Sequence, residues 1–145
     1  HGNTRNIERA VESQPEANII IHLGDGADDI VDLEFVYRDK QFYQVAGNCD
    51  WGSSLPLEGE LKVADKTIFF VHGHEYKVKT NLQQIKMEAK KRNADIVLFG
   101  HTHLPITEYD DELYLLNPGS LQNADGTYGI IDITDAGVSV QIIKV

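Results

Sequence analysis

The sequence predicts a sheet-rich α/β sandwich, and three observations support this prediction. Over the first hundred residues, short apolar segments that stop at a glycine, such as Asn18–Leu23 and Asp95–Phe99, alternate with segments of helical periodicity. From residue 106 onwards the chain has strand-like segments separated by polar turns. The 145 residues are 41% hydrophobic and 25% charged, which is typical of a globular protein. We therefore expect a single domain over residues 1–145.

Three segments have the spacing of apolar residues that is typical of amphipathic helices. The first is stopped by Pro15, and the third begins at Asn81, a residue type that caps helices. The expected helices, with the residues expected to face the core, are Asn3–Ser13 (Ile7, Ala10, Val11), Asp28–Tyr37 (Ile30, Leu33, Val36) and Asn81–Arg92 (Leu82, Ile85, Ala89).

The expected strands fall into two groups. The first group comprises Asn18–Leu23, Gln41–Ala46, a hairpin of Glu60–Ala64 and Thr67–His72, and Asp95–Phe99. The second group is expected to form consecutive antiparallel strands, a meander, from Ile106–Tyr109, Glu112–Leu116, Thr127–Ile133 and Val138–Val145.

Charge and composition limit the classes of function. The chain has 13 basic and 23 acidic residues, a net charge of −10, so we expect no nucleic-acid binding, which requires a basic face. Phosphate chemistry then requires bound metal ions to supply positive charge.

No apolar run reaches the roughly 20 residues of a membrane helix. Cys49 is the one cysteine, which excludes a disulfide framework and favours a reducing, cytoplasmic location.

Metal-competent polar side chains follow the predicted strands, next to glycines. Because ligands bind beyond the carboxyl ends of strands in α/β sheets, we expect these clusters to converge. The clusters are His1-Gly2-Asn3, Gly24-Asp25, Gly47-Asn48-Cys49-Asp50, His72-Gly73-His74 and Gly100-His101-Thr102-His103.

The spacing of His101 and His103 favours a pair of metal ions. Residues two apart in extended chain face the same side, so each imidazole can reach one member of a pair about 3.5–4 Å apart. Imidazole, carboxylate and amide donors suit manganese, iron, zinc, nickel or cobalt better than calcium or magnesium. A structural zinc site with four cysteines is excluded.

The order of these motifs resembles the calcineurin-like metallophosphoesterases, and most closely the small bacterial YfcE-like phosphodiesterase branch. The resemblance extends over essentially the whole chain, from His1-Gly2-Asn3 to Asn117-Pro118-Gly119-Ser120. It implies a four-layer αββα sandwich with the metal site at the C-terminal ends of the strands. We also expect the turn at Asn117–Ser120 to support the histidine loop through its backbone.

The resemblance implies two divalent metal ions, with manganese favoured and nickel, zinc, iron or cobalt as alternatives. Asp25 would bridge the two ions. His1 and His103 would bind the first ion, and Asn48, His72 and His101 would bind the second. Asn3, Cys49 and Asp50 are expected to lie around the ligands or at the substrate.

The sequence departs from the family pattern at two places. The first family motif is Asp-x-His, of which His1 alone is present, so we expect a chain truncated before the motif aspartate and the first strand. Many relatives have histidine directly after the motif asparagine, whereas this chain has Cys49, as the YfcE-like branch does. His74 is then the candidate general acid, with an orienting role as the alternative.

The implied function is hydrolysis of small phosphodiesters by a hydroxide that bridges two metal ions, with Asn48 and His74 in catalytic roles. A phosphomonoesterase is one alternative. The other is a non-enzymatic scaffold, because a retromer subunit resembles this same branch and works through protein contacts. The resemblance also suggests a homodimer.

Overall fold

The computed structural model describes residues 1–145 and contains three helices and nine strands. Every helix and strand expected from the sequence is present, with ends that differ by a few residues. The helices are α1 (Thr4–Glu12), α2 (Val31–Val36) and α3 (Gln83–Lys91). The strands are β1 (Ile19–His22), β2 (Gln41–Gln44), β3 (Glu58–Val63), β4 (Lys66–Val71), β5 (Ile96–Phe99), β6 (Ile106–Asp110), β7 (Leu113–Asn117), β8 (Thr127–Thr134) and β9 (Gly137–Lys144).

A five-stranded sheet with the order β3-β4-β5-β7-β6 forms the centre of the molecule. Strands β4, β5 and β7 run parallel, and β3 and β6 are antiparallel edge strands. The apolar residues of β4 alternate between two cores: Phe69 and Val71 pack in the core that contains Ile85 of α3, and Phe70 packs in the core of the opposite face. The continuous apolar run of β4 therefore reflects a strand that is buried on both faces.

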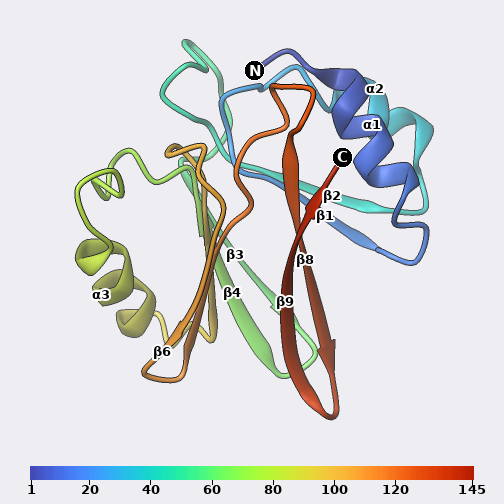
Figure 1. Cartoon of the computed structure of the whole chain (residues 1–145). Helices are drawn as coiled ribbons and strands as arrows, with labels where there is room; N and C mark the ends of the chain where they lie inside the picture. The colour runs from blue at the N-terminus through green and yellow to red at the C-terminus, as the bar shows by residue number, and fades with distance from the viewer.

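Two pairs of strands cover the face of the sheet opposite α3. The parallel pair β1-β2 contributes Ile21 and Tyr43 to this core, and the antiparallel pair β8-β9 contributes Ile131 and Val140. Helices α1 and α2 pack outside β1-β2 through a small core that includes Ile7 and Leu33 together with Phe42 of β2. The layers are thus α3, the five-stranded sheet, the two strand pairs, and α1 with α2, so the chain has the expected αββα order (Figure 1).

The expected meander is wrong in one respect. β6 and β7 form one antiparallel hairpin and β8 and β9 form another, but β7 and β8 do not pair. Instead β7 lies parallel to β5, with Val97 opposite Leu115. Both residues are fully buried, so the apolar β7 takes an interior position in the sheet and the chain crosses to the next layer before β8.

The second helix is shorter than expected. It begins at Val31, and although Ile30 and Leu33 are buried, Val36 is 64% exposed. Val36 follows the apolar spacing, but it is the last residue of α2 and its side chain faces solvent. None of the helices is sufficiently long and apolar to cross a membrane.

The loops that follow β1, β2, β4 and β5 meet at one edge of the molecule. The N–H of Gly100, after β5, donates to the carbonyl of His72, after β4, at 2.9 Å. The His72 ring in turn contacts the carbonyl of Leu23, after β1, so the loops of the two sheet layers are joined at this edge.

Candidate metal centre

Asp25 follows β1 at the edge where the loops meet, and it is 6% exposed. Its Oδ1 accepts the backbone N–H of Cys49 at 2.8 Å. Its Oδ2 lies 3.4 Å from His1 Nε2 and 3.3 Å from His72 Nε2. Oδ2 therefore lies between two histidine rings, while Oδ1 is held by the loop that contains Cys49.

Asp25 and two of the histidines have left-handed backbone conformations. The φ angles are 62° at Asp25, 65° at His101 and 59° at His103. Such a conformation costs a residue with a Cβ atom about 1–2 kcal/mol. Strained residues of this kind concentrate at functional sites, where neighbouring contacts hold them in place.

His72 is 2% exposed and has a defined tautomer. Its Nδ1 lies 2.7 Å from the carbonyl oxygen of Leu23, which can only accept, so Nδ1 carries the hydrogen. Nε2 then carries no hydrogen, so its lone pair is free to bind a metal ion. It lies 3.1 Å from Asn48 Oδ1 and 3.1 Å from His101 Nδ1. Burial lowers the pKa of His72, which keeps the ring neutral at pH 7.

His101 is neutral as well. Burial, followed by the positive charge of Lys79 and the neighbouring His72, lowers the pKa of His101 to about 4. Its lone pair is therefore available at neutral pH.

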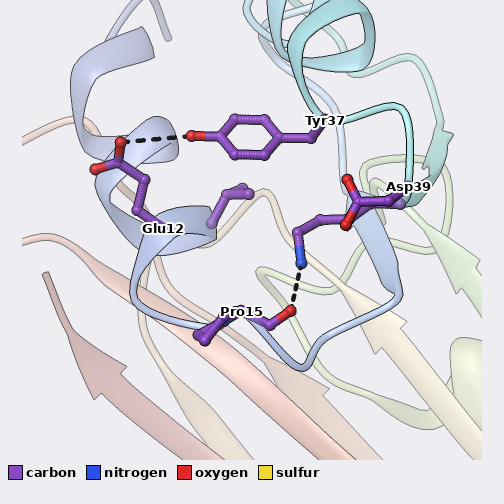
Figure 2. A pocket seen from close by; sticks show the side chains of 6 residues that line it. Glu12, Pro15, Tyr37 and Asp39 are labelled. Atoms are coloured by element: carbon purple, nitrogen blue, oxygen red, sulfur yellow. Dashed lines mark hydrogen bonds between the residues drawn. The ribbon is translucent and has the colours of Figure 1, made fainter.

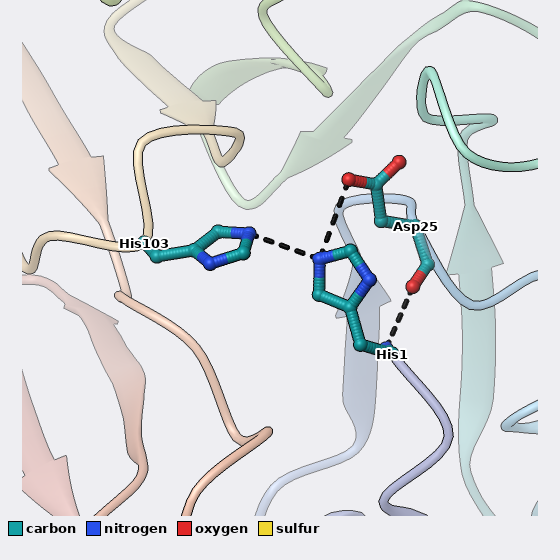
Figure 3. Close-up of side chains that lie close together, drawn as sticks. All are labelled: His1, Asp25 and His103. Atoms are coloured by element: carbon teal, nitrogen blue, oxygen red, sulfur yellow. Dashed lines mark hydrogen bonds and ion pairs between the residues drawn. The ribbon is translucent and has the colours of Figure 1, made fainter.

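His1 and His103 face each other on the other side of Asp25. Their Nε2 atoms are 2.9 Å apart, and the His1 ring lies between His103 and the Asp25 carboxylate (Figure 3). His1 comes directly before α1, and His103 comes from the loop after β5. Residues about a hundred positions apart thus bring their ring nitrogens to one point.

These side chains form two groups of three donors that share Asp25. One comprises His1, Asp25 and His103, the other Asp25, His72 and His101, and the donor atoms within each group lie within 4.8 Å of one another. Neutral imidazoles and a carboxylate are ligands of divalent transition metals. The residues present therefore fit a pair of such ions, and the positive charge of those ions would compensate for the burial of the Asp25 carboxyl group.

Comparison with known proteins gives the family. The model of the calcineurin-like phosphoesterase superfamily domain matches residues 1–136. This chain belongs to the calcineurin-like phosphoesterase superfamily. Metallophosphoesterases act with divalent metal ions, which agrees with the donor sets of this family member.

Two curated relatives are similar over most of this calcineurin-like chain. The "Probable metallophosphoesterase YsnB" of Bacillus subtilis is 30% identical over 114 residues, which cover 78% of this chain and 64% of that protein. The phosphodiesterase MJ0936 of Methanocaldococcus jannaschii is 27% identical over 135 residues, which cover 82% of this chain and 78% of that protein. The match thus spans less than two thirds of the length of the first relative and about four fifths of the second.

Solved structures share the calcineurin-like fold at lower sequence identity. A predicted phosphoesterase from Streptococcus pneumoniae has a TM-score of 0.84 and 23% identity, covering 99% of this chain and 84% of that one. Wild-type Vps29 of Entamoeba histolytica, complexed with zinc, has a TM-score of 0.67 and 17% identity, covering 96% of this chain and 88% of that one.

The loop after β2 contains three of the residues expected at the site. Asn48 brings its Oδ1 to the donor group of His72 and His101. Cys49 contributes its backbone N–H to Asp25, and desolvation and the Asp25 charge raise the pKa of its thiol. A raised thiol pKa disfavours the thiolate, so Cys49 lacks the character of a nucleophile. Asp50 belongs to neither donor group and accepts the backbone N–H groups of Asp25, Ala27 and Gly47.

The other two expected residues have different surroundings. Asn3 caps α1, its Oδ1 accepting the N–H of Asn6 at 3.2 Å, while its Nδ2 donates to the carbonyl of Gln122 at 2.9 Å. His74 lies beside the second donor group, with its ring 5.4 Å from that of His72 and 6.0 Å from that of His101. Its Nδ1 is buried and has no hydrogen-bond partner in the protein.

Three supporting groups were not identified from the sequence. The Asn117 side chain, rather than the backbone of its turn, supports the histidine loop: its Nδ2 donates to Gly100 O and to Thr102 Oγ1, both at 2.9 Å. Gln44 contacts the loop that contains Asp25. An asparagine at the end of a buried strand is a signal that could have indicated Asn117. The Leu23 carbonyl has no signal in sequence because any residue provides one.

A hollow beside the C-terminal end of α1 contains neither donor group (Figure 2). Lys40, which lines the hollow, donates to the carbonyls of Ala17 at 2.7 Å and Pro15 at 3.0 Å. Tyr37, also in the lining, donates to Glu12 at 3.5 Å. These polar groups are used to join the chain segments around the hollow, so we assign no site to it.

Proposed function

We propose that this chain, as one domain over residues 1–145, is a binuclear metal-dependent phosphodiesterase that hydrolyses small phosphodiesters. The observation that carries the proposal is the pair of donor groups that share Asp25 Oδ2. The similarity to a relative named phosphodiesterase supports the same class of substrate. A cytoplasmic location and a homodimer are parts of the proposal that rest on the sequence and the resemblance.

The ligand assignment follows the two donor groups. His1, His103 and Asp25 would hold one ion, and Asp25, Asn48, His72 and His101 would hold the other, with manganese favoured over nickel, zinc, iron or cobalt. Divalent ions bound there would lower the pKa of a bound water and neutralise charge on the phosphoryl oxygens.

The residues of this chain supply orientation and proton transfer. The Leu23 carbonyl fixes the His72 ring with Nε2 directed at the ligand side. The Asn48 amide is placed to donate from Nδ2 to a phosphoryl oxygen, since its Oδ1 faces His72. His74 is the proton donor to the leaving oxygen in this proposal, because its Nδ1 has no partner within the protein.

The scaffold alternative has one structural observation in its favour. The outer surface of α2 exposes Val31, Phe35 and Val36 at 56%, 70% and 64% of their surface, which suits a protein contact. Convergence of five donor side chains from the N-terminal segment and three loops favours the hydrolase, because a scaffold does not require them.

The test is hydrolysis of bis(p-nitrophenyl) phosphate with manganese, compared with the same sample in chelator. Loss of a group that only supports a metal ligand costs about 10–100-fold. Because Asp25 is itself a proposed ligand, Asp25→Asn should lower kcat by more than that. Asp95→Asn is the matched control, because the Asp95 carboxylate also accepts a backbone N–H, that of Thr67 at 2.8 Å, at the opposite end of the sheet.

Turnover that is insensitive to chelator and to Asp25→Asn would contradict the proposal. A folded, metal-loaded protein without turnover would favour the scaffold. Faster hydrolysis of p-nitrophenyl phosphate than of the diester would change the assignment to a phosphomonoesterase.

A further inference from the structure

We propose that Asp50 and Gln44 are positioning residues that clamp the backbone of the Gly24–Ala27 loop and thereby set the affinity for the metal pair. The clamp holds Asp25 in the orientation in which one oxygen serves both donor groups. The inference rests on the proposed function, because it assigns these residues to the same metal centre.

Asp50 binds the N–H groups of two loops at once. Its Oδ2 accepts the N–H of Asp25 at 2.8 Å and the N–H of Gly47 at 2.7 Å. Its Oδ1 accepts the N–H of Ala27 at 2.9 Å. The Asp50 side chain therefore accepts three backbone N–H groups, and hydrogen bonds of this kind to a carboxylate are stronger than those between neutral groups.

Gln44 binds the carbonyl groups of the same loop from the end of β2. Its Nε2 donates to Ala27 O at 3.0 Å and to Gly26 O at 3.3 Å. Asp50 and Gln44 together therefore satisfy both polar backbone groups of Ala27, and Asp50 satisfies the N–H of Asp25. Neither side chain is among the two donor groups.

The clamp acts on a residue that needs it. Asp25 has a φ of 62°, a conformation that an aspartate abandons easily when its backbone is free. The contact is reciprocal, because Asp25 Oδ1 accepts the N–H of Cys49 from the loop that Asp50 belongs to. Loss of the clamp would let the Asp25 carboxylate rotate, and both donor groups would lose their shared oxygen.

The experiment measures manganese binding without turnover. Manganese is titrated into the full chain, and the free ion and the exchange-coupled signal of the bound pair are followed by electron paramagnetic resonance. We expect Asp50→Ala to weaken manganese binding about 10–100-fold and to remove the coupled signal. Gln44→Ala should weaken binding less. Asp50→Asn should be intermediate, because it keeps one acceptor oxygen and places an amide NH2 against a backbone N–H.

Matched controls separate positioning from stability. Asp95→Ala removes a carboxylate that accepts the Thr67 N–H, and Gln14→Ala removes an amide that donates to Tyr128 Oη at 3.0 Å. Both controls should lower the unfolding temperature and leave manganese affinity and the coupled signal unchanged.

Unchanged manganese affinity in folded Asp50→Asn and Gln44→Ala would overturn the clamp while leaving the proposed function in place. A wild-type chain that binds none of manganese, nickel, zinc, iron and cobalt would overturn the proposed function, and the clamp with it. If Asp50→Ala does not fold, the two milder variants decide between these outcomes.

Discussion

Backbone groups direct the side chains of the metal centre. The Cys49 N–H occupies Oδ1 of Asp25, which leaves Oδ2 for the donor groups, and the Leu23 carbonyl fixes the tautomer of His72. These contacts require the loops to approach very closely. A Cβ atom on Gly47 would lie 2.4 Å from Asp25 N and 2.1 Å from Asp25 Oδ1, so only glycine fits there.

At this scale we predict that Gly47→Ala separates the Asp25 loop from the Asn48 loop. The added methyl group should cost about 1–3 kcal/mol of stability, as overpacking does, and should lower manganese-dependent turnover by at least about tenfold. The free energy of unfolding in urea and kcat with the phosphodiester are the measurements.

Gly52→Ala is the control within the same loop. Gly52 has a φ of 75° but no heavy atom within 4 Å of the added Cβ, so its substitution should cost about 1–2 kcal/mol through backbone strain and leave turnover unchanged. Equal losses of turnover in the two variants would contradict the steric argument.

At the scale of elements, the ends of the strands position the metal-ligating side chains, and buried side chains hold the conformation of the loops. The histidine loop after β5 depends on β7, the neighbouring strand, because Asn117 at its end is fully buried and bonded to Gly100 O and Thr102 Oγ1. The parallel position of β7 beside β5 therefore matters for the site as well as for the core.

We predict that Asn117→Ala displaces His101 and His103. The carbonyl of Gly100 would lose its side-chain partner in a buried place, which should cost about 1–3 kcal/mol of stability. Manganese affinity should fall with it, as measured by titration of the free ion.

Asn81→Ala is the corresponding control for loss of an asparagine contact. Asn81 Oδ1 accepts the N–H of Gln83 at 3.0 Å at the start of α3, away from the donors. Its loss should cost about 0.5–1.5 kcal/mol, as the loss of one ordinary hydrogen bond does, with unchanged manganese affinity. If Asn117→Ala binds manganese with wild-type affinity, the histidine loop after β5 keeps its conformation without the Asn117 side chain, which would contradict the prediction.

At the scale of the whole molecule, the metal centre joins the two sheet layers. His72 and His101 follow strands of the five-stranded sheet, whereas Asp25 and Asn48 follow β1 and β2 of the opposing layer. A ligand shared across these layers binds only the folded chain, because the donors are far apart when the chain is unfolded.

Manganese should therefore stabilise the fold as a whole. At a free concentration of 100 times Kd the free energy of unfolding should rise by about 2.7 kcal/mol, and chelator should remove the gain. Thermal unfolding with and without manganese is the measurement, and Asp25→Asn should abolish the shift. An unfolding temperature that stays the same in a protein shown to bind manganese would contradict a site that bridges the layers.

The sequence predicted more of the elements than of their pairing. The apolar spacing of Ile7, Ala10 and Val11 placed α1 correctly, because helical periodicity is a property of neighbouring residues. The partner of β7 was missed, because alternation along Leu113–Asn117 is compatible with any neighbouring strand. The structure brings five of the predicted ligand side chains into two groups, and their role as metal ligands stays a prediction. Their supporting contacts were not predicted.

By itself the sequence determined the helices and strands and the residue types that meet at the strand ends, because each of these is encoded within a few consecutive residues. The αββα order was expected from the resemblance to the family. The tertiary structure alone decided that Asp25 Oδ2 faces both donor groups, that His72 presents Nε2, and that Asp50, Gln44 and Asn117 hold the loops. The physical reason is that these contacts join side chains to backbone groups from distant segments, and every residue type offers the same backbone N–H and C=O.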